Sequence, residues 1–445
     1  MWFTERAYHY DPELDPEKFR ALENEVIRKR SFFATPNTYF EPEVAARLLN
    51  QYLDEKIFTD TELLNFDGVM LNEHHGTPFC LGAVMDVEAA ALAKATKRVK
   101  IVLLGNPVTT VGNPIRLGEE LAMIDLISGG RLVPGWVRGA GSEQLANNAN
   151  PALNRELLEE GIDLIVESWT RPGPFRYEGK HFHFRHVNPW VKPLQQPHPP
   201  FWMPGLVSPD TAAWCAKRRI PYIALATKLK PTTELWDFYA QAAAQEGYQA
   251  GPENFGFMQP VMVADTQDRA EEMGKRILFG GAFAHFARPE WMFPSGYNSK
   301  AATRRLAEND FGPNATNKPL YGEGGETTDE EIESVRRIIY DSYAEMQREM
   351  VMIAGTPDNV IPRLNKVLDV LRPGIFSFWL DGPVPAADRK RCLELLNSEV
   401  IPAMRAYGKV IGLTDPFSCA PGGKLLDGRP PAPVADLEAL AALGL

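Results

Sequence analysis

Two adjacent histidines stand directly after a short apolar segment in the first part of the chain. Residues 66–71 (Phe-Asp-Gly-Val-Met-Leu) predict a strand, and Asn72, Glu73, His74 and His75 follow it. An imidazole at the end of a strand can take or give a proton near neutral pH. Paired histidines also occur at metal sites, but this spacing differs from His-Glu-x-x-His and no set of further ligands is evident. We therefore expect one catalytic histidine, His74 ahead of His75, and no metal; the alternative is a histidine that is only hydrogen-bonded in place.

A glycine-rich segment ends another expected strand, residues 132–137. Residues 135–143 read Gly-Trp-Val-Arg-Gly-Ala-Gly-Ser-Glu. Glycine lets a backbone approach a ligand closely, and the guanidinium of Arg138 can hold an anionic oxygen or a ring carbonyl with directed N–H groups. A tight turn with a solvated arginine explains the same residues equally well. Arg138 is therefore a candidate ligand-binding residue.

The densest apolar run, residues 99–104, ends at Gly105 and Asn106. Gly105 would let a flat ring lie against the strand end, because it has no side chain there. Asn106 could hydrogen-bond such a ring. A plain turn is the alternative for both residues, which we regard as candidates for cofactor binding.

A further strand end leads into a helix at residues 204–211 (Pro-Gly-Leu-Val-Ser-Pro-Asp-Thr). Ser208 or Asp210 can cap this helix, with Pro209 in its first turn. The free N–H groups and the dipole at a helix start attract phosphate, so Gly205 and Ser208 are candidates for cofactor binding. An ordinary capped helix is the alternative, and Asp210 opposes an anion unless its side chain points away.

These segments belong to a regular alternation of short strands and longer helices, from residue 31 to about residue 405. Such an alternation predicts parallel strands with right-handed crossovers. Counting residues 31–34 as the first strand gives about eight units, so we expect an α/β fold, a (β/α)₈ TIM barrel whose strand ends open into one mouth. An open doubly wound sheet is the alternative, but no Gly-x-Gly-x-x-Gly opens a helix after a strand.

Several segments depart from the alternation. We expect residues 1–30 to be an N-terminal extension, 31–406 the barrel and 407–445 a tail rich in proline and glycine. One insertion, residues 175–200, follows a middle strand and is expected to carry a small hairpin. A longer one near strand 7, residues 280–328, is expected to form a lid, because such insertions often exclude water from a reaction. Four aromatic residues of this lid are expected to face the substrate or to pack the lid itself: His285, Trp291, Phe293 and Tyr297.

Composition excludes some classes of function. The chain of 445 residues is 44% hydrophobic and 24% charged, as in globular proteins. Its formal net charge of -11 argues against binding to nucleic acid. The sequence contains no apolar run of about 18 residues and no apolar signal segment at its start, so we expect a cytoplasmic protein outside the membrane. The four cysteines form no Cys-x-x-Cys pair, which favours buried free thiols.

Taken in order, these motifs resemble the bacterial luciferase-like family of flavin-dependent monooxygenases. The resemblance runs from about residue 66 to residue 405. The segments that carry it are residues 66–75, 113–132, 135–139, 208–223, 354–358 and 399–403. Their order and spacing carry more weight than any single motif.

The resemblance implies a (β/α)₈ barrel, usually a homodimer, that takes reduced FMN from a separate flavin reductase. The reduced flavin and O₂ then oxygenate a small organic substrate. His74 occupies the place of the family's important active-site histidine. Arg138 and Ser208 match residues that contact the flavin, with Ser208 at its phosphate, and Gly105 and Asn106 match the strand end beneath the ring.

The sequence also departs from the family. Val137 stands where light-emitting luciferases have a reactive cysteine, so we do not expect light emission. Both insertions differ from those of the enzymes that act on long-chain aldehydes, which leaves the substrate open. Within the same fold, the alternatives are a deazaflavin-dependent dehydrogenase and a non-catalytic flavin-binding barrel; a metal-dependent hydrolase is a weaker one.

Overall fold

The structure is a computed structural model. It describes residues 2–4, 15–78, 80–206, 208–225, 227–282, 287–308, 328–380, 382–418 and 437–443. His285 lies outside these residues, so its expected place at the substrate stays a prediction.

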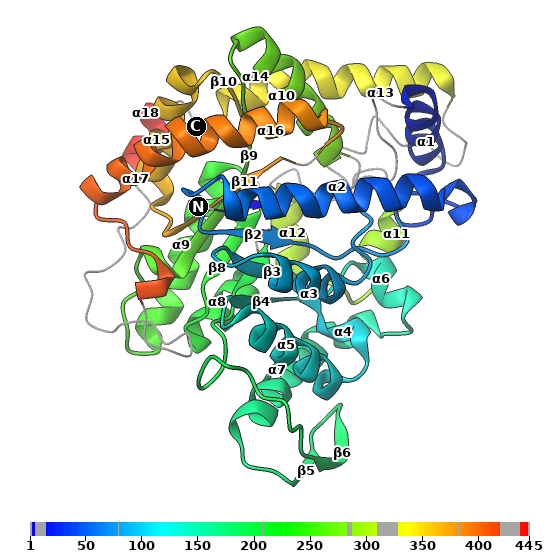
Figure 1. Cartoon of the computed structure of the whole chain (residues 1–445), viewed down its shortest axis with the longest axis vertical. Coiled ribbons are helices and arrows are strands. Elements are labelled where there is room, and N and C mark those ends of the chain that lie inside the picture. Colours follow the sequence, from blue (N-terminus) through cyan, green and yellow to red (C-terminus); the bar gives the residue numbers. More distant parts are fainter. Residues whose placement is uncertain are drawn as a thin grey trace.

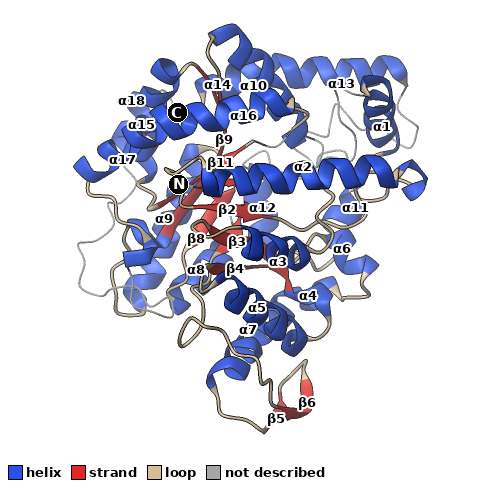
Figure 2. Cartoon of the chain, in the orientation of Figure 1, coloured by secondary structure: helices blue, strands red, loops and turns tan. Residues whose placement is uncertain are grey.

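Parallel strands form the centre of the molecule (Figures 1 and 2). In chain order they are β1 (Trp2–Thr4), β2 (Gly68–Leu71), β3 (Lys100–Pro107), β4 (Leu132–Val137), β7 (Met203–Gly205), β8 (Tyr222–Leu225), β9 (Phe255–Val263), β10 (Ile353–Gly355) and β11 (Ile375–Trp379). Their order in the sheet is β4-β3-β2-β1-β11-β9-β8-β7, and β10 pairs with the far end of β9. All residues of β3 after the first are buried, as the Val/Ile/Leu run predicts for a strand covered on both faces.

One isolated parallel bridge pairs Gly135, in one end strand of this order, with Trp202, which precedes the other end strand. The N–H of Trp202 donates to the carbonyl of Pro134 at 3.0 Å, and the N–H of Trp136 donates to the carbonyl of Trp202 at 3.3 Å. The bridge therefore joins β4 to the residue before β7. The predicted (β/α)₈ fold is confirmed.

The first strand is not where the sequence placed it. Residues 31–34 form a turn, with only an isolated antiparallel bridge between Ser31 and Ala287. The first strand is β1, where Trp2 pairs with Gly68 of β2 and with Ser377 of β11. A three-residue strand is defined by these partners, which are distant in the sequence, and it carries no local pattern. The segment that we expected to be an N-terminal extension therefore contains a strand of the sheet.

Helices surround the strands on the outside (Figure 2). The main ones are α2 (Pro42–Thr61), α3 (Met85–Ala95), α5 (Pro114–Ser128), α7 (Asn154–Thr170), α8 (Pro209–Arg218), α9 (Leu229–Gln245), α10 (Gln267–Ala282) and α15 (Pro357–Leu371). A last long segment consists of α16 (Ala386–Leu395), the π-helical turn η5 (Leu396–Val400) and α17 (Ile401–Val410). In α5, the Asn113 side chain accepts the N–H of Arg116 and Gly129 ends the helix at a φ of 69°.

The core has two layers. Between strands and helices lies one large cluster that includes Leu103, Ile165 and Val367. A second cluster takes alternate residues from the strands, as the interior of a barrel does. Its buried members are Met70, Val102, Leu104, Val133, Trp202, Ile223, Met258 and Ile375.

The remaining elements are short connections or belong to the insertions. The connections are α4 (Val108–Val111), α6 (Gly141–Ala146), η1 (Asn37–Tyr39), η2 (Pro151–Leu153), η3 (Pro252–Asn254), η6 (Pro416–Ser418) and α18 (Leu437–Ala442). The hairpin expected in residues 175–200 is present as β5 (Phe175–Glu178) and β6 (His183–Val187). The lid region and its flank carry α11 (Pro289–Met292), α12 (Lys300–Glu308), α13 (Asp329–Asp341) and α14 (Tyr343–Arg348).

The N-terminal helix α1 (Pro16–Lys29) packs on α13, the helix that follows the insertion (Figure 1). A buried ion pair joins them: Arg336 donates to Glu23 at 2.9 Å, and also to Asn24 at 2.6 Å. Three of the four cysteines, Cys80, Cys215 and Cys392, are buried free thiols, as expected. In the described part of the chain, no helix is both long and apolar enough to cross a membrane.

Candidate functional site

His74 lies just beyond the end of β2 and is held by a carboxylate. Its Nδ1 is 3.1 Å from Oε1 of Glu143, a residue of α6 that is 3% exposed, whereas the imidazole is 32% exposed. A carboxylate in this position favours the tautomer with a proton on Nδ1. That tautomer leaves Nε2 as the nitrogen that can take a proton.

Glu143 itself is fixed by backbone donors. Its Oε1 also accepts the N–H of His75 at 3.0 Å, and its Oε2 accepts the N–H of Ala140 at 2.6 Å. Burial alone would raise the pKa of Glu143, but the hydrogen bonds from His74, Ala140 and His75 favour the ionised form and lower the pKa. A charged carboxylate is therefore maintained behind His74.

His75 has a different partner and points elsewhere. Its Nε2 is 3.1 Å from Oε1 of Glu73, whose other oxygen accepts the N–H of Met85 at the start of α3. The hydrogen bond to Glu73 raises the pKa of His75. His75 therefore serves the packing of its own loop, which agrees with the preference for His74.

Asp86 stands next to this loop, and its ionisation opposes folding. Its Oδ1 is buried without a hydrogen-bond partner among the described residues. Burial, together with the charges of Glu73 and Glu120, raises its pKa from 3.8 to about 7. Because the folded pKa lies above the unfolded one, stability is lost as the pH rises from about 4 to about 7.

We expect Asp86→Asn to remove this loss. At pH 8 the variant should gain at least about 1.4 kcal/mol in the free energy of unfolding, the equivalent of one pKa unit. Urea denaturation at pH 5 and pH 8 measures the difference. Asp54→Asn, at an exposed position, is the control, and an identical pH dependence in Asp86→Asn and the wild type would show that the burial argument is wrong.

Arg138 follows β4 and holds the lid region. Its two terminal nitrogens donate to the carbonyl of Tyr297 at 2.8 Å and to Oδ1 of Asn298 at 3.2 Å. Its guanidinium also lies 4.7 Å from the centre of the Tyr297 ring, and the Tyr297 hydroxyl donates to the carbonyl of Gly139 at 2.8 Å. The solvated arginine that the sequence left open is thus ruled out: Arg138 links β4 to residues 160 positions away.

The other expected lid residues lie near the start of α6. A Cβ on Gly141 would lie 2.6 Å from the carbonyl of Trp291 and 2.1 Å from Pro294, so only glycine lets the lid sit here. Phe293 packs against Tyr297 with ring centroids 5.9 Å apart. These contacts show how the insertion packs, and its role as a lid and the contact of Trp291, Phe293 and Tyr297 with a substrate stay predictions.

Gly105 and Asn106 lie near the end of β3, and both contact β4. A Cβ on Gly105 would lie 3.0 Å from the N atom of Trp136 and 3.0 Å from Val137. The buried Asn106 donates to the carbonyl of Gly135 at 3.1 Å. Gly105 therefore allows the two strand ends to approach closely, and the Asn106 amide holds them together. A role beneath a flavin ring stays a prediction.

Ser208 is the N-cap of α8, with Pro209 in the first turn. Its hydroxyl oxygen accepts the N–H of Thr211 at 3.4 Å and the Thr211 hydroxyl at 3.1 Å, which leaves its own proton free to donate. Arg155, from α7, reaches Oγ1 of Thr211 at 3.3 Å. Asp210 accepts the Ser299 hydroxyl at 2.9 Å, so its carboxylate is engaged by the lid region.

These groups fit a phosphate. The Ser208 hydroxyl, the Arg155 guanidinium and the N–H groups of a helix start are donors that suit phosphate, and the Thr211 hydroxyl orients Ser208 by donating to it. The sequence identified Ser208 but missed Thr211 and Arg155. Thr211 stands one helical turn after the cap, which is a usable signal, whereas Arg155 comes from a different helix and only the fold places it here.

Gly205 allows Tyr222 to reach this region. A Cβ on Gly205 would lie 2.3 Å from the hydroxyl oxygen of the fully buried Tyr222. Burial raises the pKa of the Tyr222 hydroxyl. The N–H of Ser208 and the positive charges of Arg138 and Arg155 lower this pKa, but by less than burial raises it. The Tyr222 hydroxyl donates to the carbonyl of Leu206 at 3.3 Å, close to the cap of α8.

We expect Gly205→Ala to destabilise the fold by about 1–3 kcal/mol, because the new methyl group overlaps a rigid phenol. Gly118→Ala is the matched control: its nearest neighbours would lie at 3.5 Å, and alanine favours the helix α5. Urea denaturation of both variants measures the difference. Equal stability of Gly205→Ala and the wild type would refute the packing argument.

Side-chain contacts thus link the segments that follow β2, β4 and β7 along one edge of the sheet. Glu143 connects the β2 end to α6, and Gln144 of the same helix donates to the carbonyl of Arg138 at 2.7 Å. The lid residues Tyr297 and Ser299 then extend the contacts to Asp210 of α8. His74, Arg138 and Ser208 therefore belong to one connected region.

A sequence model of the family described as luciferase-like monooxygenase matches residues 55–367. The chain belongs to the luciferase-like monooxygenase family. Membership makes it an oxidoreductase and agrees with the connected region, which lies at the strand ends where barrel enzymes carry their active sites. Among the described residues, we find no group of three or more His, Cys, Asp or Glu that could hold a metal ion.

Individual relatives of this luciferase-like chain are distant. It is 24% identical over 341 residues to "Flavin-dependent trigonelline monooxygenase, oxygenase component" of Acinetobacter baylyi, which covers 75% of this chain and 84% of that protein. The solved monooxygenase RslO1 from Streptomyces bottropensis aligns with a TM-score of 0.60 at 19% identity, over 81% of this chain and 94% of that one. An F420-dependent secondary alcohol dehydrogenase aligns with a TM-score of 0.55 at 16% identity, over 81% and 95%. The two solved structures support the fold alone.

Proposed function

We propose that this chain is the oxygenase component of a two-component monooxygenase. It uses reduced FMN, supplied by a separate flavin reductase, and O₂ to oxygenate a small organic substrate. The observation that carries the proposal is the His74–Glu143 pair, which lies on the same edge of the sheet as the donor set around Ser208. The relative named as the oxygenase component of a flavin-dependent monooxygenase supports the division of labour with a reductase.

Each group has a defined task in this proposal. Ser208 and Arg155 bind the phosphate with the N–H groups of α8, and Thr211 orients the Ser208 hydroxyl. Arg138 holds the lid region closed above the strand ends, which excludes water. Reduced flavin, when bound, supplies the two electrons that allow one oxygen atom of O₂ to enter the substrate while the other leaves as water.

His74 manages a proton in this reaction. Because Nδ1 donates to Glu143, Nε2 is the nitrogen that acts as a base, and the protonated imidazole can return the proton to the departing oxygen. The buried carboxylate of Glu143 stabilises the imidazolium in between. Gly105 and Asn106 form the strand end over which the flavin ring lies. The proposed enzyme is a homodimer, as the resemblance to the family implies.

A deazaflavin-dependent dehydrogenase is the second candidate, because an F420-dependent enzyme aligns with this chain almost as well as the monooxygenase does. Anaerobic calorimetric titration separates the two. We expect micromolar binding of reduced FMN, with oxidised FMN and the reduced deazaflavin at least about tenfold weaker. Tight binding of the deazaflavin with no measurable binding of reduced FMN would favour the dehydrogenase.

A further inference from the structure

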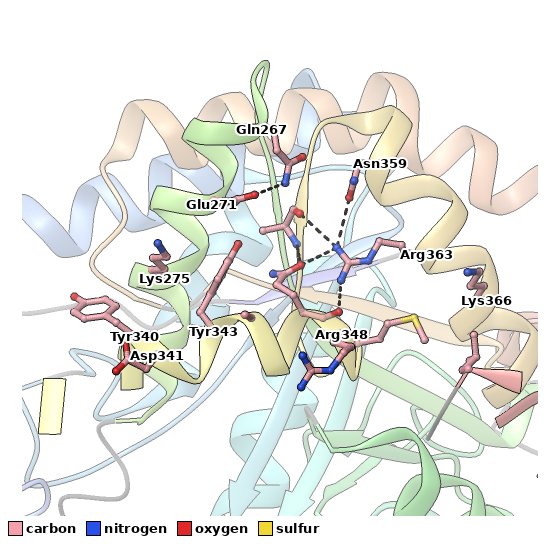
Figure 3. A pocket seen from close by; sticks show the side chains of 15 residues that line it. Gln267, Glu271, Lys275, Tyr340, Asp341, Tyr343, Arg348, Asn359, Arg363 and Lys366 are labelled. Atoms are coloured by element: carbon pink, nitrogen blue, oxygen red, sulfur yellow. Dashed lines mark hydrogen bonds between the residues drawn. The ribbon is translucent and has the colours of Figure 1, made fainter. Parts of the chain in front are cut away.

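A polar pocket of about 860 Å³ lies away from the connected region described above (Figure 3). Side chains of α10, α14 and α15 form most of its wall, with the end of α13 at one side. Helix α10 precedes the 280–328 insertion, and α13 and α14 follow it. The pocket therefore lies between the two stems of the lid region.

Two buried polar groups of the pocket wall have no hydrogen-bond partner among the described residues: the Tyr343 hydroxyl and Nε2 of Gln347. Tyr343 is only 6% exposed, and Figure 3 shows its hydroxyl directed toward α10, between Lys275 and Glu271. Leaving such groups unsatisfied costs about 1–3 kcal/mol each, which a ligand in the pocket could recover.

Both unpartnered groups are available as donors. Oε1 of Gln347 accepts the N–H of Ala354 at 3.1 Å and Nη1 of Arg363 at 2.7 Å, so the orientation of its amide is fixed and Nε2 carries two free protons. Burial raises the pKa of Tyr343, so its hydroxyl keeps its proton at neutral pH. A matching ligand must therefore offer acceptor oxygens.

The charges of the wall favour an anion. Four cationic side chains line the pocket against two carboxylates, in a chain whose net charge is -11. The cations are Lys275, Arg348, Arg363 and Lys366, and the carboxylates are Glu271 and Asp341. The Lys275 ammonium lies 5.5 Å from the centre of the Tyr343 ring. Glu271 accepts the Gln267 amide at 2.9 Å.

We propose that this pocket binds a small multivalent oxyanion, a phosphate or a carboxylate compound, that bridges α10 and α14. Tyr343, Gln347 and Lys275 donate to its oxygens, and Arg348 and Lys366 supply charge at the rim. A ligand held in this way ties the two stems of the lid region together. None of these residues belongs to the proposed flavin site. The test therefore measures ligand binding and does not depend on turnover.

Calorimetric titration of the full chain tests the proposal, with inorganic pyrophosphate and citrate as probes at matched ionic strength. We expect at least one probe to bind with a submillimolar Kd. Tyr343→Phe and Lys275→Gln should each weaken this binding about tenfold, the effect of losing one hydrogen bond to a charged ligand. Tyr343→Phe removes a hydroxyl without a partner, so the melting temperature should not fall.

Two matched variants serve as controls: Tyr407→Phe, whose hydroxyl donates to Asp369 on α15, and Lys97→Gln at an exposed loop position. Both should bind the probes as the wild type does. Binding of pyrophosphate alone or of citrate alone tells a phosphate site from a carboxylate site. No heat from either probe at about 5 mM, or unchanged binding in Tyr343→Phe, would overturn the proposal.

Discussion

His74→Ala is expected to lower the rate of substrate oxygenation about 10²- to 10⁴-fold, the usual contribution of a positioned general acid or base. Binding of reduced FMN should change by no more than a few-fold, because the phosphate donors around Ser208 are untouched. Product formation in the presence of a flavin reductase, together with an anaerobic binding titration, measures both effects. The imidazole is partly exposed, so its removal leaves no cavity in the core.

His183→Ala is the matched control, since His183 lies on the exposed hairpin strand β6 and pairs only with the surface residue Glu178 in the described structure. It should retain full activity. If His74→Ala turned over at the wild-type rate, the acid–base role would be wrong and the non-catalytic reading of this histidine would stand.

Glu143→Gln is expected to lower the same rate about 10- to 100-fold, because the ionised carboxylate orients His74 and stabilises its protonated form. The carboxylate accepts three hydrogen bonds with its two oxygens, whereas an amide has only one acceptor oxygen. Its NH₂ group can donate to Nδ1, which shifts the proton of His74 to Nε2. Imidazole ¹⁵N chemical shifts report this change of tautomer directly, and a purely structural role would leave them unchanged.

The same substitution has a predictable pH dependence. The folded pKa of Glu143 is lowered, so its contribution to stability is complete above the unfolded value of 4.5 and is lost as the pH falls through the folded value. The wild type should therefore lose stability at acid pH more steeply than Glu143→Gln.

Glu156→Gln is the matched control. Glu156 also pairs with a histidine, His181, at 2.7 Å, but it does so at the surface. The control should keep its activity and the tautomer of His74. Full activity of Glu143→Gln would show that His74 does not depend on the carboxylate of Glu143 for its role in the reaction.

The sequence predicts those strands and helices that have a local pattern of apolar or capping residues. The dense apolar run at residues 99–104 placed β3 within a few positions. The first strand was missed because Trp2–Thr4 has only three residues and is defined by its pairing with β2 and β11. Residues 31–34 form a turn, although the apolar pair Phe32 and Phe33 resembles a short strand.

Only part of the candidate site could be predicted from the sequence. His74, Arg138 and Ser208 were identified because each follows a strand and carries a reactive or ligand-binding group. Glu143 was not, since a glutamate in a glycine-rich turn resembles a surface residue. Its position three residues after Ala140, whose N–H it accepts, was the only local signal of its burial. The partners of Arg138 lie far along the chain, where no sequence pattern points to them.

A crystal structure of the protein with reduced FMN, grown and cooled without oxygen, tests the central claim most directly. We expect the phosphate within about 3 Å of the Ser208 hydroxyl. We expect the ring over the β3 end at Gly105, with His74 facing the flavin from the β2 end. Flavin bound at any other part of the molecule, or a phosphate that leaves Ser208, Thr211 and Arg155 untouched, would contradict it.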